Sequence, residues 1–199
     1  MTLPSFFDTH YYPAEKVFWT DRVIERTVLR VLPRFVTPNH ITLFRLLATP
    51  LTIYLLAEER YSFGIPLFLF VAFTDALDGA LARTRNMITD WGRMFDPAAD
   101  KVLVISAIVL LIIKTLPLGL ALLMIALELF VMAAAVVWRN RGGVISANVW
   151  GKIKMILQVA GIFLLLLSTW LSLPLYDGAA LVLGTSVYFS IASIVNKGI

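Results

Sequence analysis

Four aspartates at short helical spacing are the residues of this chain whose type and arrangement most clearly predict chemistry. Asp75 and Asp78 are three residues apart and Asp96 and Asp100 are four apart, so each pair lies on one face of a helix. Only a short link separates the two pairs, so these faces can oppose each other. Four ionised carboxylates this close repel one another unless some are protonated or a cation lies between them. Because oxygen ligands suit hard cations, the pattern predicts Mg²⁺ or Mn²⁺ and a phosphate-containing substrate.

The residues around the aspartates fit a ligand there, although each has a second explanation. Gly79 directly follows Asp78, where a glycine lets a ligand approach the backbone or lets two helices pack closely. We favour the ligand. Arg83 lies about one turn further on and can bind a phosphate, or it can be a charge that sets membrane topology. Gly92 suits the turn that leads into the next helix.

The composition is typical of a helical membrane protein. Of the 199 residues, 59% are hydrophobic and only 15% are charged, whereas soluble domains carry roughly 25% charged residues. The chain has no Cys, which excludes a disulfide framework and a thiol nucleophile. Its net charge of +4 follows from basic loops and not from a basic stripe on a soluble face, so we expect no nucleic-acid partner.

Apolar runs divide the chain into an N-terminal segment, 1–37, and a membrane domain, 38–199. The pattern over about 14–33 predicts an amphipathic helix that lies in the membrane interface, although packing on the bundle would explain it too. A span needs about 20 mostly apolar residues. The sequence therefore predicts an all-α integral membrane protein with six transmembrane helices at about 40–57, 63–83, 96–115, 118–138, 149–171 and 177–195.

Basic residues are distributed very unevenly between the two sides of this predicted bundle. Six spans put both termini on one side, together with the aspartates and most of the Lys and Arg, whereas the other side receives Arg60 and Lys114. The positive-inside rule therefore predicts that both termini and the aspartate end are cytoplasmic.

The segment from Asp75 to Asp100 reads D-x2-D-G-x2-A-R-x8-G-x3-D-x3-D, and it resembles the signature of the CDP-alcohol phosphotransferase (CDP-alcohol phosphatidyltransferase) family at every fixed position. Two more segments are similar to the branch of phosphatidylglycerophosphate and cardiolipin synthases. One is D-P-A-A-D-K at 96–101, and the other is G-K-I-K-M-I-L-Q at 151–158, where Met155 replaces the threonine of that branch. Asn39 and Arg45 resemble part of the segment that opens the first span of the family.

This resemblance implies an enzyme that displaces CMP from CDP-diacylglycerol, or a related CDP-lipid, with an alcohol acceptor. It implies two divalent ions, Mg²⁺ or Mn²⁺, and a homodimer in the bilayer. We expect this bilayer to be a bacterial cytoplasmic membrane. The implied metal ligands are Asp75, Asp78, Asp96 and Asp100. Asp96 and Asp100 would be catalytic, with Asp100 taking the proton of the attacking hydroxyl. The implied CDP-binding residues are Asp75, Asp78, Gly79, Ala82, Arg83 and Gly92.

The acceptor is the less determined half of the expected reaction. Basic residues on the aspartate side are candidates for binding an acceptor phosphate, although topology alone explains any one of them equally well. These candidates are Arg139, Arg141, Lys152 and Lys154. Glu128 lies within the fourth predicted span, where it either pairs with a basic residue or is protonated. Asn39, Arg45 and Glu128 are expected to support the site.

The two matched segments favour glycerol 3-phosphate as acceptor, before phosphatidylglycerol and then an inositol phosphate. Leu127 departs from phosphatidylglycerophosphate synthases, in which an arginine typically precedes the glutamate that matches Glu128. From another class of protein, an ion-coupled transporter also uses intramembrane carboxylates. Transporters more often place them near mid-membrane between internal repeats, and this sequence has no convincing repeat. The sequence therefore favours an enzyme.

Overall fold

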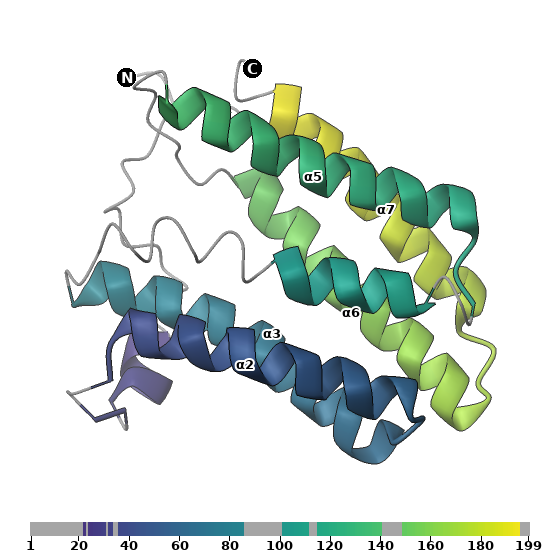
Figure 1. Ribbon diagram of the computed structural model, residues 1–199, viewed down its shortest axis with the longest axis horizontal. Coiled ribbons are helices and arrows are strands. Elements are labelled where there is room, and N and C mark those ends of the chain that lie inside the picture. Colours follow the sequence, from purple (N-terminus) through teal and green to yellow (C-terminus); the bar gives the residue numbers. More distant parts are fainter. Residues whose placement is uncertain are drawn as a thin grey trace, which may run out of the picture.

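The protein is a bundle of long helices, and its computed structural model describes residues 22, 24–30, 32–33, 36–85, 101–111, 115–140 and 149–195 (Figure 1). No strand occurs within these ranges. The helices run in chain order as η1 (Glu25–Leu29), α2 (Pro38–Ala57), α3 (Tyr61–Thr84), the helix Lys101–Leu111, α5 (Leu118–Asn140), α6 (Val149–Leu171) and α7 (Tyr176–Val195). The all-helical prediction is confirmed for the described residues.

Three helices are long and apolar enough to cross a membrane: Pro38–Ala57, Tyr61–Ala82 and Trp150–Leu171. The helices Lys101–Leu111 and Leu118–Ala134 are apolar but shorter, within the residues that the structure describes. An α-helix satisfies its own backbone hydrogen bonds, which is what a segment needs in lipid. The chain is therefore an integral membrane protein, while the count of six spans stays a prediction.

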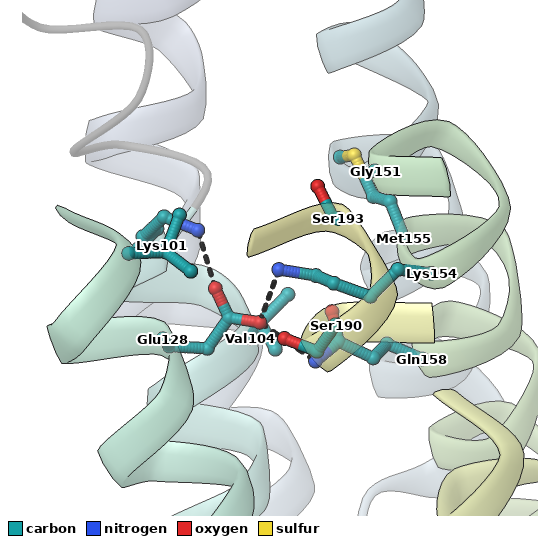
Figure 2. A pocket seen from close by; sticks show the side chains of 10 residues that line it. Lys101, Val104, Glu128, Gly151, Lys154, Met155, Gln158, Ser190 and Ser193 are labelled. Atoms are coloured by element: carbon teal, nitrogen blue, oxygen red, sulfur yellow. Dashed lines mark hydrogen bonds and ion pairs between the residues drawn. The ribbon is translucent and has the colours of Figure 1, made fainter. Parts of the chain in front are cut away.

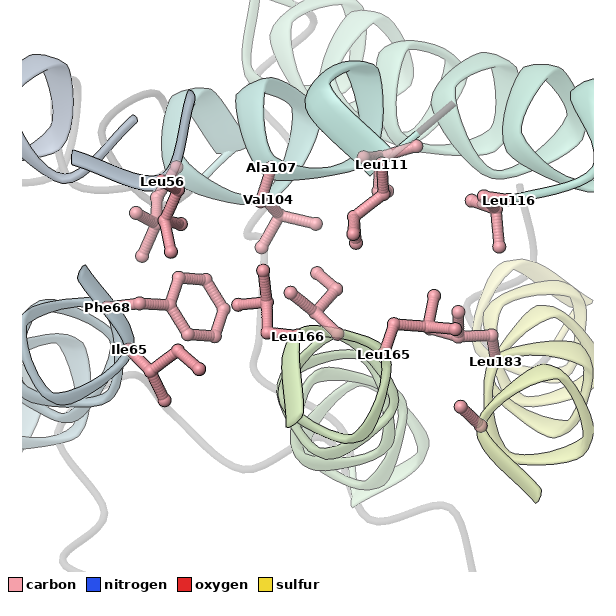
Figure 3. Close-up of a cluster of buried hydrophobic side chains, with 14 of the residues drawn as sticks. Leu56, Ile65, Phe68, Val104, Ala107, Leu111, Leu116, Leu165, Leu166 and Leu183 are labelled. Carbon is pink, nitrogen blue, oxygen red and sulfur yellow. The ribbon is translucent and has the colours of Figure 1, made fainter. Parts of the chain in front are cut away.

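The most extensive packing joins α2 to α3 and α6 to α7. Helix α3 also contacts α6, and helix α7 also contacts α5. Figure 3 shows the apolar centre of this bundle, where Phe68 of α3, Val104 of the helix Lys101–Leu111 and Leu166 of α6 point toward one another. Two glycines allow close approach. A Cβ at Gly161 would lie 2.6 Å from the side chain of Leu183, and one at Gly64 would lie 2.7 Å from Leu56. Small residues at such crossings are typical of membrane helices.

The described part of the N-terminal segment lies against α2 and α3. Leu29 of η1 is buried with Ile41, Leu77 and Leu81, and the guanidinium of Arg85 donates hydrogen bonds to the carbonyl oxygens of Leu29 and Leu32 at 3.0 and 3.2 Å. Packing on the bundle therefore accounts for this short stretch. The remainder of the predicted helix at 14–33 lies largely outside the described residues, and its position in a membrane interface stays a prediction.

The fold gathers the chemistry at one end of the bundle. Helix α2 begins at Pro38, where proline suits the first helical position and the backbone N–H of Thr37 donates to Nδ1 of His40 at 3.3 Å. The chain then runs up and down, so the start of α2, the end of α3, the start of α6 and the end of α7 share this end (Figure 1). Arg45, Asp75, Asp78, Lys154 and Ser190 come from those stretches.

Candidate active site

A single arginine holds the first aspartate pair. Asp75 and Asp78 lie one turn apart on α3, and Arg45 reaches both of them from α2. Its Nη1 lies 2.7 Å from Oδ1 of Asp75, its Nη2 pairs with Oδ2 of Asp78, and its Nε donates to the hydroxyl of Thr74 at 3.4 Å. The planar guanidinium can serve two carboxylates at once because its donors point in fixed directions. The predicted shared face of Asp75 and Asp78 is thus confirmed.

Burial makes this pairing strong. The side chain of Arg45 is fully buried, Asp78 is 3% exposed, and Asp75 is 25% exposed. Thr42, one turn before Arg45, places its hydroxyl 3.3 Å from Oδ2 of Asp78. A charged group taken out of water needs both an opposite charge and hydrogen bonds. Asp78 has both, so it is held in one orientation, while Asp75 keeps an edge toward solvent.

The oxygen chemistry of this pair fits a hard divalent cation. Carboxylate oxygens are the ligands that Mg²⁺ and Mn²⁺ prefer, and Arg45 shows that the pair is arranged to share one positive partner. Within the described ranges no group of three or more acidic, His or Cys residues could hold a metal ion. Those ranges contain two of the four predicted ligands, since Asp96 and Asp100 lie outside them, as does Gly92.

The other signature residues continue along α3. Gly79 and Ala82 are half-buried beyond Asp78, and Ala80 between them is fully buried against the cluster around Leu81. At this turn of α3, Ala80 is therefore the small residue that packs closely against its neighbours. The side chain of Arg83 lies outside the described residues. Binding of a CDP group by Gly79, Ala82 and Arg83 stays a prediction.

A second polar cluster centres on Glu128 of α5, which is 2% exposed. Its Oε2 pairs with the ammonium of Lys101, and its Oε1 lies 2.6 Å from Nζ of Lys154 and accepts a hydrogen bond of 2.8 Å from Gln158. Three helices thus meet at one carboxylate. Of the two alternatives for Glu128, pairing with basic residues is confirmed.

The Glu128 cluster forms one side of a cavity of about 170 Å³ (Figure 2). A cavity needs only about 10–15 Å³ by this measure to hold one water molecule, so this one has room for a small ligand. Polar groups from four helices face it, interrupted by the apolar Val104 and Val131. The lining residues are Lys101, Val104, Glu128, Val131, Gly151, Lys154, Met155, Gln158, Ser190 and Ser193.

The predicted acceptor candidates differ in whether they line the cavity. Lys154 lines the cavity, whereas Lys152 is half-buried on α6 and does not line it. Arg139 lies at the end of α5 with its side chain outside the described residues, and Arg141 lies outside them entirely. Asn39 lies in the first turn of α2, two turns before Arg45. Lys152, Arg139 and Arg141 remain untested as phosphate ligands.

Sequence reasoning missed several residues of these two clusters. Thr74 and Ser190 were not singled out, and Lys101 and Gln158 were noted only as letters of matched segments. A signal for the serines was available, because Ser186, Ser190 and Ser193 recur at helical spacing in an otherwise apolar span. Such a row predicts one polar face on α7.

Comparison with known proteins indicates a family of transferases. The family model for CDP-alcohol phosphatidyltransferase matches residues 35–192. A Bacillus subtilis (strain 168) protein named CDP-diacylglycerol–glycerol-3-phosphate 3-phosphatidyltransferase is 31% identical over 176 residues, which cover 80% of this chain and 91% of that protein. A protein of the same name from Aquifex aeolicus (strain VF5) is 46% identical over 65 residues, covering 33% of this chain and 36% of its own.

A third relative extends over most of both chains. The protein named "Probable phosphatidylglycerophosphate synthase" in Mycobacterium tuberculosis (strain ATCC 25618 / H37Rv) is 33% identical over 169 residues, covering 79% of this chain and 78% of its own. The family match spans both polar clusters, from Arg45 on α2 to Ser190 on α7. The chain therefore belongs to the CDP-alcohol phosphatidyltransferase family, and it is a membrane-embedded transferase.

Proposed function

We propose that this enzyme transfers the phosphatidyl group of CDP-diacylglycerol to glycerol 3-phosphate and releases CMP. The observation that carries this proposal is the cavity with Lys101 and Lys154 on its wall, at the same end of the bundle as the aspartates. The names of the relatives support the same acceptor.

The charge of the cavity suits a phosphate monoester. Lys101 and Lys154 contribute two positive charges and Glu128 one negative charge, so the cluster carries a net charge of +1. Each ammonium has three N–H donors, and the pairing with Glu128 leaves donors for a ligand. Glu128 therefore holds two lysine ammonium groups close together at the cavity. A doubly charged phosphate would find an attractive, partly preformed site there.

The cavity and the aspartates are connected through the chain. Lys101 directly follows Asp100 in the sequence, and consecutive Cα atoms are about 3.8 Å apart. An acceptor whose phosphate binds Lys101 and Lys154 would thus have its hydroxyl near the start of the helix Lys101–Leu111, which Asp100 directly precedes in the sequence. This arrangement supports Asp100 as the group that takes the hydroxyl proton.

In the proposed reaction, the acceptor oxygen forms a bond to the phosphorus of the phosphatidyl group. The bond between that phosphorus and the oxygen shared with CMP breaks, and CMP leaves with the electron pair. Asp75, Asp78, Asp96 and Asp100 would hold two Mg²⁺ or Mn²⁺ ions, which supply neutralising charge for the pyrophosphate when bound. Arg45 keeps Asp75 and Asp78 in place, and Gly79, Ala82, Arg83 and Gly92 would border the CDP group.

The membrane arrangement is part of the proposal. Six spans would put both termini and the two polar clusters on the cytoplasmic side, where soluble glycerol 3-phosphate reaches the cavity while the lipid tails of the donor stay in the bilayer. Arg60 lies between α2 and α3 at the opposite end, which agrees with the charge bias behind this orientation. The interfacial N-terminal helix and the homodimer belong to the same proposal.

Release of CMP with one acceptor at a time tests the proposed function. The purified protein is incubated in detergent–lipid micelles with CDP-diacylglycerol, Mn²⁺ or Mg²⁺, and a single acceptor. We expect release with glycerol 3-phosphate. Release only with phosphatidylglycerol would identify a cardiolipin synthase, and release only with an inositol phosphate would identify that branch. No release, together with ion-dependent uptake into proteoliposomes, would identify a transporter.

A pair of lysine variants tests the acceptor site within the same assay. Lys154→Gln removes a charge from the cavity, whereas Lys152→Gln removes the same charge two residues away, outside the lining. Because a hydrogen bond to a charged group contributes about 1.5–3 kcal/mol, Lys154→Gln should raise KM for glycerol 3-phosphate by roughly 10–100-fold. Equal effects of the two variants would contradict the cavity as the phosphate site.

A further inference from the structure

One buried hydroxyl at the cavity lacks a partner. Ser190 of α7 is 2% exposed and lines the cavity, and its Oγ forms no hydrogen bond in the part of the chain that the structure describes. Figure 2 shows it between Lys154 and Gln158, beside the Glu128 cluster. Buried hydroxyls are nearly always hydrogen-bonded, so one that is not calls for an explanation such as a water molecule or a ligand.

The other hydroxyls of α7 show what Ser190 could have done instead. Ser186, one turn earlier and fully buried, donates to the carbonyl oxygen of Leu183 at 2.6 Å. Thr185 donates to Leu181 at 2.7 Å. Serine in a membrane helix is commonly satisfied by its own backbone in this way. The hydroxyl of Ser190 makes no such bond and faces the cavity, where it can meet a ligand.

The neighbours of Ser190 restrict what that ligand group is. Both carboxylate oxygens of Glu128 already accept hydrogen bonds, and the amide nitrogen of Gln158 donates to one of them. The lysine ammonium groups can only donate. Ser190 is therefore a group at this wall that can both donate and accept, so it can pair with a hydroxyl of the ligand in either direction, which the lysines cannot do. The class of ligand is a small phosphorylated polyol.

We infer that Ser190 binds the non-reacting hydroxyl of the acceptor and so selects a phosphorylated polyol over a phosphorylated simple alcohol. This inference rests on the proposed function. In glycerol 3-phosphate, the phosphate would lie at Lys101 and Lys154, one terminal hydroxyl would attack the donor, and the central hydroxyl would contact Ser190. Ser190 is thus a specificity-determining residue of the acceptor site.

Kinetics of Ser190→Ala and its matched control Ser186→Ala test the inference. We expect Ser190→Ala to raise KM for glycerol 3-phosphate about threefold to tenfold, the loss of one neutral hydrogen bond, with KM for CDP-diacylglycerol within about twofold of wild type. Ser190→Thr keeps a hydroxyl and should recover most of the affinity. Ser186→Ala should leave both KM values unchanged. An unchanged acceptor KM in Ser190→Ala would overturn the inference.

An acceptor analogue identifies the hydroxyl concerned. 3-Hydroxypropyl phosphate has the phosphate and the attacking hydroxyl but lacks the central one. If Ser190 binds the central hydroxyl, wild type should lose kcat/KM with the analogue, and Ser190→Ala should use both acceptors almost equally. If instead the loss of kcat/KM from Ser190→Ala and the loss from the analogue multiply, as two independent effects do, the inference is overturned. Absence of CMP release from wild type with glycerol 3-phosphate would instead refute the proposed function.

Thermal melting separates ligand binding from a structural role. Because the hydroxyl of Ser190 has no hydrogen-bond partner among the described residues, Ser190→Ala should melt no lower than wild type without acceptor, and glycerol 3-phosphate should raise its Tm less. A lower Tm without acceptor and an undiminished rise with it would mean that the hydroxyl serves the fold.

Discussion

Replacing Arg45 with methionine should destabilise the protein markedly while leaving its packing volume nearly unchanged. The guanidinium is fully buried and pairs with Asp75 and Asp78, of which Asp78 is 3% exposed. Removing one partner of a buried pair leaves an uncompensated charge and costs roughly 3–5 kcal/mol. Thr42 still donates to Asp78, so we expect a loss of about 3 kcal/mol. At roughly 2–4 °C per kcal/mol for a chain of this size, Tm should fall by about 6–12 °C.

The assay is thermal melting of the purified protein in detergent, for Arg45→Met and for the triple variant with Asp75→Asn and Asp78→Asn. Neutral amides need no buried cation, so the triple variant should recover most of the lost stability. It should nevertheless lack CMP release. Wild-type stability in Arg45→Met, or no recovery in the triple variant, would refute the reasoning that Arg45 neutralises these two carboxylates.

Three further predictions concern other parts of the structure. Glu128→Leu should cost about 3–5 kcal/mol by removing the buried carboxylate that two lysines share, whereas Glu128→Gln should cost less, and equal melting of the two variants would contradict this. Gly161→Ala should cost about 1–3 kcal/mol because its Cβ would meet Leu183, whereas Gly184→Ala, with nothing within 4 Å, should melt no lower than wild type. EDTA should abolish CMP release, and Mn²⁺ should raise the Tm of wild type but not of Asp78→Asn; equal shifts would argue against a metal at Asp78.

Much of the helical framework could be predicted from hydropathy. The fifth predicted span, 149–171, coincides with α6, and the second, 63–83, differs from α3 by two residues at its start and one at its end. These runs are long and apolar because lipid accepts only segments that satisfy their own backbone. The position of Asp75 and Asp78 toward the end of α3 was also predictable, because both follow the apolar run of that predicted span.

Side-chain partners were less predictable, because they depend on how separate helices are rotated against one another. Spacing within α3 placed Asp75 and Asp78 on one face, but it carried no information on Arg45, which is 30 and 33 residues away. Likewise, the sequence alone did not show whether Glu128, an isolated glutamate within an apolar run, has a charged partner. The structure shows that it does, because three helices meet at its carboxylate. Ser190 was missed because a serine in a membrane helix usually bonds its own backbone.

Transfer of label from glycerol 3-[³²P]phosphate into lipid tests the central proposal most directly. Wild-type protein is given CDP-diacylglycerol, Mn²⁺ and the labelled acceptor, and both CMP and the label in the organic phase are measured. If the hydroxyl attacks while the phosphate stays bound in the cavity, one labelled phosphate should enter lipid for each CMP released, and Lys154→Gln should slow both equally. Release of CMP with the label remaining in the aqueous phase would contradict glycerol 3-phosphate as the acceptor.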